Sequence, residues 1–534
     1  MASLPPDRGA ASGAFTDAKG CKEWLATLPL TNIPQAQALL LEGLRSLNAA
    51  SFDPLERLKC LELARERAAF LQGEQRSRYF GKTLPLSPTD AAAWNTGRLL
   101  LAEIEAGYRR CQETAAQEAM RPHRALIVQR LVRYIGAQMA FHASIYRRFE
   151  PELWLRLHGL FAQAEKQGLL EERVKDSLES DERGSSVMEA YVHVVLLQAA
   201  YLSELTAPQM DFVEGLLRAW ARKVVVRPAS AADASPMLPL AVDLDKPIGA
   251  RPLLPADAHA AHRVLHVEEL SKSLRKRLHG LAKGESVADL HLPVQASSVD
   301  VQPQLQRLHK LWCEGAPPRP SARVPEEKTA GVVWSLPDIW FFVSGGKAFE
   351  QPGGESRELT SEEKQDIEVF GRVRERTHSR AANVPNVTAE PWGIIDEMLG
   401  AWRLMRPTTA SRGVAIGRVL AMRLGDTAPF LVGYVSGLVQ EVDGSIVITL
   451  RLFPGKPEPL AVRPGEPRNR NASQWVPALH LPALEKLRVP ATLVVPSGLA
   501  SRGRQVEYWD GGVKTLTVGE VLERGTDFDR VVAG

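Results

Sequence analysis

Apolar residues recur at helical spacing through the first two fifths of the chain. Leu40, Leu44 and Leu47 fall at i, i+4 and i+7, so they share one face of a helix. Asp53 followed by Pro54 supplies an N-cap with proline at the first helical position, which predicts that another helix begins there. This periodicity predicts a helical architecture for the N-terminal part of the chain.

Further apolar stripes continue the same pattern. Thr89 or Asp90 is expected to cap a helix that runs through Tyr108. The other stripes predict helices over residues 124–148, 153–160, 187–205 and 212–220. No signature of a helical repeat of about 34 residues is visible, so the pattern favours an all-α bundle over a solenoid.

The character of the sequence changes near Val224. Pro, Ala, Asp and Ser dominate residues 227–239, and the following stretch contains two helical patterns, 267–282 and 302–312. Lys272, Arg275, Lys276 and Arg277 form a basic face on the first of these helices, and a solvated helix surface is the favoured interpretation over a phosphate-binding patch. The proline-rich residues 317–320 are typical of a linker.

Short strands dominate from residue 331 onward. Residues 332–334 and 339–343 are predicted strands, and residues 446–452 alternate between apolar and polar or small side chains. Asp443-Gly444 and the stretch 510–512 predict tight hairpin turns. Many short strands joined by tight turns favour a small antiparallel β-barrel.

These patterns predict an α+β multidomain chain, with an N-terminal all-α helical bundle followed by a C-terminal small antiparallel β-barrel. The expected divisions are a disordered N-terminus (1–20), the helical bundle (21–226), a mixed connector with helices (227–330) and the β-rich barrel region (331–534). A length of 534 residues is too great for one core and agrees with several domains.

Composition narrows the class of protein. The 66 basic and 63 acidic side chains nearly cancel, which does not favour a general nucleic-acid binder. The four cysteines form no CxxC pair, so free thiols in a reducing compartment are expected. The longest apolar stretch, 192–202, is too short to span a bilayer, and the N-terminus has no apolar signal segment, so we expect a cytoplasmic protein.

Signatures of catalysis are missing from the sequence. It contains no Walker A loop, no GxSxG elbow and no HExxH motif. His123, His142, His158 and His193 lie singly in the helical part, where surface or core histidines are far commoner than metal ligands. We therefore expect no enzyme, no cofactor and no metal.

An arginine cluster is the strongest candidate for chemistry. Arg372, Arg374, Arg376 and Arg380 lie within nine residues, and Asp396 follows at the start of a β segment. Arginine offers a planar fork for bidentate phosphate contacts and also stacks on a purine face. By residue type alone, a solvated basic loop remains the alternative interpretation.

The order of these features resembles PilZ domains, small barrels that bind cyclic di-GMP. The family pattern is an RxxxR loop, a spacer and a strand bearing [D/N]xSxxG. The stretch 376–380, Arg-Thr-His-Ser-Arg, matches the first part, and 372–376 matches it in a second register. The second part corresponds to the stretch 396–401, Asp-Glu-Met-Leu-Gly-Ala. The resemblance implies that Arg372, Arg376, Arg380 and Asp396 bind cyclic di-GMP.

Two positions depart from the family pattern. Met398 stands where the family has serine, and Ala401 stands where it has glycine, while Gly400 lies one place earlier. Met398 cannot offer the hydroxyl, and Ala401 adds a Cβ where the family backbone is expected to need positive φ or close approach. The resemblance thus implies a cytoplasmic regulatory protein that binds cyclic di-GMP to control a protein partner. The alternatives are a ligand-free interaction scaffold and, from a third class, an enzyme.

Overall fold

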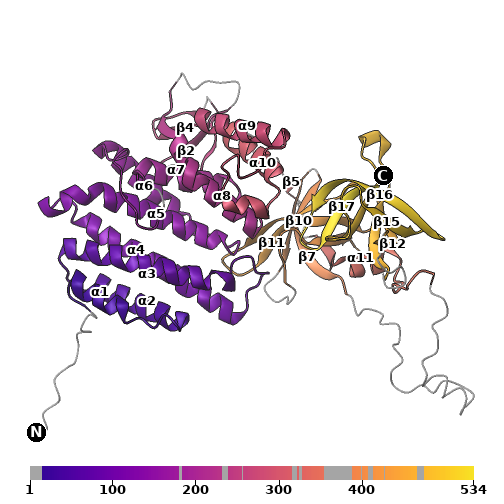
Figure 1. The fold of residues 1–534 in the computed structure, drawn as a ribbon, viewed down its shortest axis with the longest axis horizontal. Coiled ribbons are helices and arrows are strands. Elements are labelled where there is room, and N and C mark those ends of the chain that lie inside the picture. The colour runs from indigo at the N-terminus through magenta and orange to yellow at the C-terminus, as the bar shows by residue number, and fades with distance from the viewer. Residues whose placement is uncertain are drawn as a thin grey trace, which may run out of the picture. The chain divides into compact units, whose positions relative to one another are not determined.

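The computed structural model describes residues 15–179, 183–230, 238–254, 257–315, 322–323, 328–353, 388–398, 400–406, 413–425, 427–465 and 474–533. The chain divides into two compact units, Met1–Pro318 and Arg319–Gly534 (Figure 1). The helical N-terminal region and the C-terminal antiparallel barrel that the sequence predicts are both confirmed.

The first unit is mainly helical, and Figure 1 shows its first helices stacked side by side. Its α-helices are α1 (Ala18–Ala26), α2 (Ile33–Ala49), α3 (Pro54–Gln75), α4 (Pro88–Glu113), α5 (Arg124–Ala143), α6 (Glu152–Gln167), α7 (Val187–Ala199), α8 (Ala207–Trp220), α9 (Glu268–Ala282) and α10 (Val301–Cys313). Short 3₁₀ helices lie at Arg76–Arg78, Glu118–His123, Leu202–Glu204, Ala221–Lys223 and Val294–Ser298. Among the described residues, none of the helices combines the length and apolar character required to cross a bilayer.

Local signals set the starts of these helices. Asp53 caps α3 through its side chain, which accepts a hydrogen bond from the Glu56 N–H, and Pro54 takes the first helical position as predicted. The predicted cap of α4 at Thr89 or Asp90 is wrong. Ser87 caps this helix, because the proline at position 88 is suited to the first helical turn.

Two predicted helices end earlier than the apolar pattern indicated. α5 stops at Ala143 instead of 148, and Tyr146 beyond it has φ of 56°. α7 stops at Ala199 instead of 205, and Tyr201 has φ of 53°. A residue in the left-handed region ends a right-handed helix whatever the apolar pattern beyond it.

A small antiparallel sheet completes the first unit. Its strands are β1 (Val225–Pro228), β2 (Leu240–Asp243), β3 (Arg251–Pro252) and β4 (His262–His266), in the order β1-β4-β2-β3. Trp312 of α10 donates its indole N–H to the Leu196 carbonyl of α7 at 3.0 Å. The described part of the predicted connector up to residue 315 therefore contributes strands and helices to the first unit.

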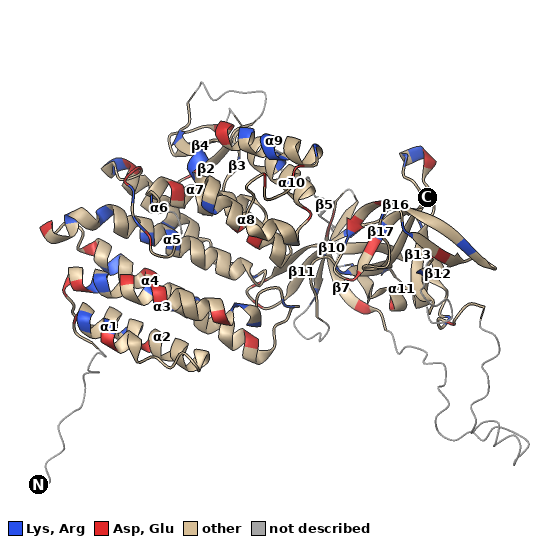
Figure 2. Ribbon diagram, in the orientation of Figure 1, with Lys and Arg blue, Asp and Glu red and all other residues tan. Residues whose placement is uncertain are grey.

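The basic residues of α9 make contacts within the first unit. Lys272 pairs with Glu269 at 2.7 Å, and the Arg275 Nε lies 3.2 Å from the ring of His309. In Figure 2, basic and acidic residues are interspersed along the helices of the first unit.

The second unit contains two rings of antiparallel strands. Its strands are β5 (Ala322–Arg323), β6 (Thr329–Trp334), β7 (Glu390–Met398), β8 (Ala401–Arg406), β9 (Val419–Leu424), β10 (Leu431–Gln440), β11 (Ile446–Leu452), β12 (Glu458–Pro464), β13 (Val476–Leu481), β14 (Thr492–Pro496), β15 (Gln505–Trp509), β16 (Val513–Arg524) and β17 (Phe528–Ala533), with a 3₁₀ turn at Glu485–Leu487. One sheet has the order β5-β7-β6-β9-β10-β11-β8, and pairing of β7 with β8 closes six of its strands into a ring. We call this the first ring. The closed barrel β12-β13-β14-β17-β16-β15 follows.

Both predicted hairpins of this unit are present. β10 and β11 pair from Gln440 and Ile446 outward, around the turn that contains Gly444. β15 and β16 pair from Trp509 and Val513 outward, around the turn that contains Gly511. Both turn glycines have positive φ, as a tight hairpin requires.

The strand predicted at residues 339–343 is wrong, because this segment belongs to helix α11 (Leu336–Val343). Ser335 caps the helix by accepting a hydrogen bond from the Asp338 N–H. Leu336 and Ile339 are buried one turn apart, which is the spacing of a helix rather than of a strand.

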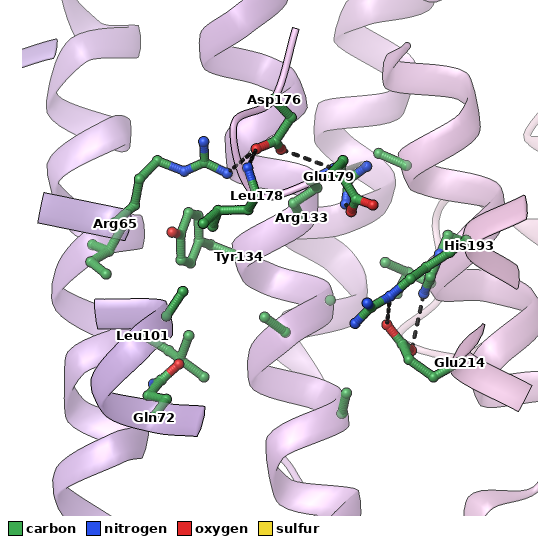
Figure 3. Close-up of a pocket in the computed structure, with 18 of the residues that line it drawn as sticks. Arg65, Gln72, Leu101, Arg133, Tyr134, Asp176, Leu178, Glu179, His193 and Glu214 are labelled. Atoms are coloured by element: carbon green, nitrogen blue, oxygen red, sulfur yellow. Dashed lines mark hydrogen bonds and ion pairs between the residues drawn. The ribbon is translucent and has the colours of Figure 1, made fainter. Parts of the chain in front are cut away.

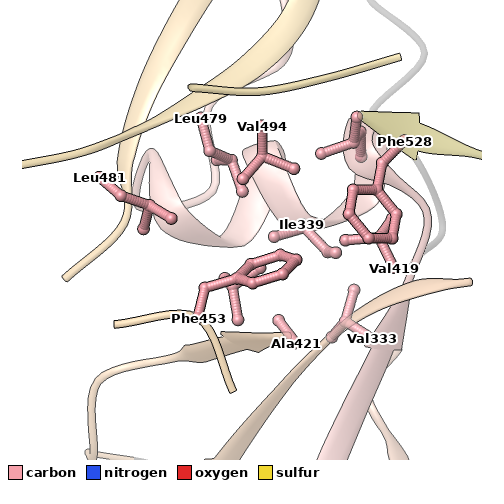
Figure 4. Packing of buried hydrophobic residues seen from close by; sticks show 11 residues of the cluster. Val333, Ile339, Val419, Ala421, Phe453, Leu479, Leu481, Val494 and Phe528 are labelled. Atoms are coloured by element: carbon pink, nitrogen blue, oxygen red, sulfur yellow. The ribbon is translucent and has the colours of Figure 1, made fainter. Parts of the chain in front are cut away.

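α11 packs into a core that joins the first ring to the closed barrel. Buried members of this core come from both rings and from the helix, as Figure 4 shows: Val333, Leu336, Ile339, Val419, Ala421, Val432, Phe453, Leu479, Leu481, Val494 and Phe528. A run of five apolar residues does not distinguish strand from helix, and here the shape of the shared core decides.

Candidate functional site

The four sequence-predicted site residues divide into two groups. Arg372, Arg376 and Arg380 lie outside the described residues. Asp396 lies near the end of β7 in the first ring. The geometry around Asp396 therefore provides the structural account of the predicted site.

Asp396 is a buried carboxylate with one partnered oxygen. Only 5% of the residue is exposed, and its Oδ2 accepts a hydrogen bond from Arg403 Nη1 at 2.9 Å. Its Oδ1 is buried and has no hydrogen-bond partner within the described part of the chain. A buried acceptor without a partner is costly, and it marks a place where a ligand donor would be stabilised.

A β-bulge sets the direction of this carboxylate. The register between β7 and β8 shifts between Ile394 and Asp396, so that Ile394 pairs with Leu404 and Asp396 pairs with Arg403. Leu404 is fully buried, and adjacent strand residues point to opposite faces. Asp396 and Arg403 therefore lie together on the face opposite to Leu404. Bulges often redirect side chains next to functional sites.

The hairpin between β7 and β8 resolves one departure from the family pattern. Met398 pairs with Ala401 where the hairpin begins, and Gly400 between them has φ of 73°. Ala401 is not among the residues with positive φ, and it is buried in β8. The glycine conformation that the turn requires is supplied by Gly400, so the Cβ of Ala401 causes no backbone strain there.

A polar cluster stabilises the base of β7. Glu390 Oε2 accepts hydrogen bonds from the indole N–H groups of Trp334 at 3.2 Å and Trp392 at 3.1 Å. Arg406 is almost fully buried, with its Nη1 3.6 Å from Glu390 Oε1 and its guanidinium over the Trp392 ring. Burial lowers the pKa of Arg406, and Glu390 opposes that shift. These contacts join β6, β7 and β8 and fix the strand that carries Asp396.

The arrangement at Asp396 is suited to the recognition of N–H donors. A carboxylate whose unpaired oxygen is held in place accepts N–H donors, such as those on the edge of a purine base. Arg403 keeps the carboxylate oriented, and its side chain is 34% exposed. The described surroundings contain neither a nucleophile with a neighbouring base nor a metal-ligand set around Asp396.

A second candidate is a cavity of about 350 Å³ in the helical unit (Figure 3). Small residues create the hollow between α3, α5 and α7: Ala68, Ala69, Gly136, Ala137, Ala140 and Ala190. A cavity of this size is within the range of small-molecule sites.

The ionic groups that line this cavity pair with one another. Asp176 accepts from Arg65 at 2.7 Å, and Glu179 pairs with Arg133. Arg218 is also in the lining and lies 3.7 Å from Glu214. The lining carboxylates therefore neutralise the lining arginines, and the cavity offers little excess positive charge for a doubly charged nucleotide.

Glu214 illustrates this internal pairing. Burial opposes ionisation of its carboxyl, but the charge of His193 and its hydrogen bond at 3.1 Å lower the pKa of Glu214 to about 2. The carboxylate remains ionised at neutral pH and paired to His193. His193 is one of the histidines expected to have no metal role, and its contact is with a carboxylate of α8.

Sequence reasoning missed the partner of Asp396 and the ionic cavity. Arg403 is seven residues from Asp396, and only the hairpin with its bulge brings the two side chains together. Arg65 and Asp176 are 111 residues apart. A charged residue inside an otherwise apolar helical stripe, such as Arg65, is the signal that would have indicated a buried ion pair.

Two family models match this chain, one toward its N-terminus and one toward its C-terminus. The family described as "Cyclic-di-GMP receptor FimW, N-terminal domain" matches residues 19–230, and the "FimW C-terminal beta-barrel domain" matches residues 460–532. The second range corresponds to the closed barrel, and the first ring lies between the two matches.

One curated relative aligns along most of the chain. The "Cyclic-di-GMP receptor FimW" of Pseudomonas aeruginosa is 21% identical over 538 positions, which span 92% of this chain and 86% of that protein. No solved structure matches this chain. The matched descriptions name a cyclic-di-GMP receptor and do not name PilZ.

Proposed function

We propose that this chain is a regulatory protein that binds cyclic di-GMP at the first ring and passes the signal to a protein partner. The ligand class is supported by similarity along 92% of the chain to a protein named as a receptor for this nucleotide. The single observation that carries the site is the buried Oδ1 of Asp396 beside Arg403, which has no hydrogen-bond partner among the residues that the structure describes.

The proposed roles follow from the chemistry of each residue. The Oδ1 atom of Asp396 accepts hydrogen bonds from the N–H groups of a guanine edge. Arg376 and Arg380 contact the phosphates and stack on the guanine faces, with Arg372 replacing Arg380 if the second register is used. The spacing of the arginines and the position of Asp396 on β7 support this division of roles.

Met398 is expected to weaken the binding of cyclic di-GMP. A thioether does not replace the hydrogen bond of a hydroxyl, and losing one such contact weakens binding by about 1–3 kcal/mol, or roughly tenfold to hundredfold. Replacing Met398 with serine is expected to strengthen binding, since position 398 begins the β7–β8 hairpin close to Asp396.

Calorimetric titration of the full chain with cyclic di-GMP tests the proposal. Asp396→Asn and Arg380→Ala are each expected to weaken binding by at least roughly tenfold, because each removes a charged hydrogen-bond partner. Arg374→Ala is the matched control, since Arg374 belongs to the same cluster but to neither RxxxR register. Circular dichroism of each variant verifies its fold.

Nucleotide specificity provides a second readout. Guanine presents N–H donors to a carboxylate and adenine does not present the same pair, so cyclic di-AMP is expected to bind far more weakly. Absence of heat with cyclic di-GMP at tens of micromolar protein would refute the proposal and leave the ligand-free interaction scaffold. Equal losses in Arg374→Ala and Arg380→Ala would show that the cluster acts only as diffuse positive charge.

A further inference from the structure

The small sheet of the first unit brings together two histidines and an aspartate. Asp243 is the last residue of β2, and His262 is the first residue of β4, and the two are direct partners in the strand register. His259 lies three residues before His262, in a turn closed by the hydrogen bond from the His262 N–H to the His259 carbonyl at 2.9 Å. Backbone pairing and this turn therefore place all three side chains.

The distances within this group approach those of a metal centre. Asp243 Oδ2 lies 3.2 Å from His259 Nε2 and 3.8 Å from His262 Nε2, and one ligand atom of each residue lies within 4.8 Å of the others. Ligands about 2.0–2.1 Å from zinc at tetrahedral angles are about 3.3 Å apart. Movement of the rings until these separations approach about 3.3 Å would complete three corners of a tetrahedron.

We propose that Asp243, His259 and His262 form a binding site for a divalent transition metal ion, with Zn²⁺ as the best-suited ion. Imidazole nitrogen and carboxylate oxygen are ligand types that zinc accepts, whereas Mg²⁺ and Ca²⁺ favour oxygen alone. Asp243 and His262 are at least nine-tenths buried and His259 is exposed, which gives the ion a route of entry. Water would occupy the fourth position.

The surroundings support a preformed carboxylate ligand. Asp243 Oδ1 accepts a hydrogen bond from the Asp245 N–H at 3.1 Å, which leaves Oδ2 directed at the two rings. Hydrogen bonds of this kind orient metal ligands.

Without a metal, other donors neutralise the carboxylate. Lys246 Nζ lies 3.0 Å from Asp243 Oδ2. The Nδ1 atoms of His262 and His259 accept backbone N–H bonds of 3.2 and 3.3 Å, which places the proton of each neutral ring on Nε2, facing Asp243. Metal binding must displace the lysine, move both ring protons to Nδ1 and break these two long hydrogen bonds.

These competing contacts give the proposal a specific test. Lys246 is 60% exposed at its side chain, so Lys246→Ala removes a rival cation without opening the core. If the group is a metal site, Lys246→Ala binds zinc at least as tightly as the unmodified chain. If the group is only a hydrogen-bonded cluster around a buried carboxylate, the variant loses stability and gains no affinity for metal.

The experiment uses the full chain without a histidine tag, with Co²⁺ as a spectroscopic probe and Zn²⁺ in calorimetry. One equivalent of Co²⁺ per chain with the strong visible absorption of a four-coordinate centre is expected, and Zn²⁺ should displace it. His259→Ala removes an exposed ligand and is expected to weaken zinc binding by at least tenfold. His279→Ala is the matched control, because this histidine is exposed on α9 and is not a member of the cluster.

The possible results of this experiment either support the metal site or overturn it. Loss of the cobalt spectrum in His259→Ala and its retention in His279→Ala would support the site. Absence of a saturable equivalent in the unmodified chain, or equal binding by His259→Ala, would overturn it. Zn²⁺ should also raise the unfolding temperature of the unmodified chain and leave that of His259→Ala unchanged, since the ion would join the 259–262 turn to β2.

Discussion

Asp176→Asn is expected to destabilise the helical unit strongly, because Asp176 joins three parts of it. Its Oδ1 accepts from Arg65 of α3 at 2.7 Å, and its Oδ2 accepts from Arg130 of α5 at 2.9 Å. The side chains of all three residues are at most 3% exposed. The substitution would keep the shape of the carboxylate but remove its charge from between two buried guanidinium groups.

The magnitude follows from the burial of these partners. Removing one member of a buried ion pair costs about 3–5 kcal/mol, because the remaining charge has lost its solvation and its partner. Glu62 would still hold Arg130 at 2.9 Å and Arg65 at 3.4 Å, so the lower part of this range is expected. A loss of about 3 kcal/mol is a large part of a typical domain stability of about 5–15 kcal/mol.

The same carboxyl makes stability depend on pH. Burial alone raises its pKa, but Arg130 and Arg65 more than offset this, so the pKa of Asp176 lies below its ordinary value. A carboxyl whose pKa is lower in the folded than in the unfolded state stabilises the fold in its ionised form. This stabilisation is fully present above the unfolded-state pKa of about 3.9 and is lost as pH falls through the folded-state pKa. The unmodified chain should therefore lose its advantage over Asp176→Asn below about pH 4.

Urea unfolding followed by far-ultraviolet circular dichroism measures these differences. Asp211→Asn is the matched control, since Asp211 pairs with Arg76 and both side chains are about a third or more exposed. An exposed pair contributes at most about 1 kcal/mol. If Asp176→Asn costs no more than Asp211→Asn, the buried cluster does not stabilise the unit to this extent.

Two further predictions concern packing and the polar cluster of the first ring. In Gly433→Ala, the new Cβ would lie 2.1 Å from the carbonyl oxygen of Arg451, so a lower melting temperature and a cost of about 1–3 kcal/mol are expected. Gly159→Ala, whose new Cβ would have no described atom within 4 Å outside its chain neighbours and its own helix backbone, should instead gain about 0.5–1 kcal/mol. Equal effects of the two variants would contradict the argument. In Glu390→Gln, Arg406 loses its ion pair, and thermal unfolding should show a loss of about 1.5–3 kcal/mol with a changed tryptophan emission. An unchanged melting temperature and emission would show that Glu390 does not hold the cluster together.

Helices were predicted well where periodicity and caps agreed. Leu40, Leu44 and Leu47 are all buried on α2, and Asp53 caps α3. These signals act over a few residues, and so they are visible in the sequence. The segment of α11 was misread as a strand because its apolar run is short, and the surrounding core of the two rings decided its conformation.

The candidate site could be predicted only in part. The motif predicts Asp396 as a site residue, and this role stays a prediction. Its pairing with Arg403 depends on a bulge that changes the register by one residue. The same comparison questioned Ala401, and the structure shows that Gly400 supplies the positive φ. Register and bulges arise from pairing between strands, and a linear pattern does not specify them.

The sequence by itself determined the order of a helical part and a β-rich part, because helical periodicity, caps and hairpin turns are local properties. Only the tertiary structure decided which charged residues, and which of the proposed metal ligands, contact one another. Asp176 reaches Arg65 across 111 residues, and Asp243 meets His262 through strand pairing. Contacts of this kind depend on the packing of whole elements, since each partner is stabilised only when the other has been brought to it.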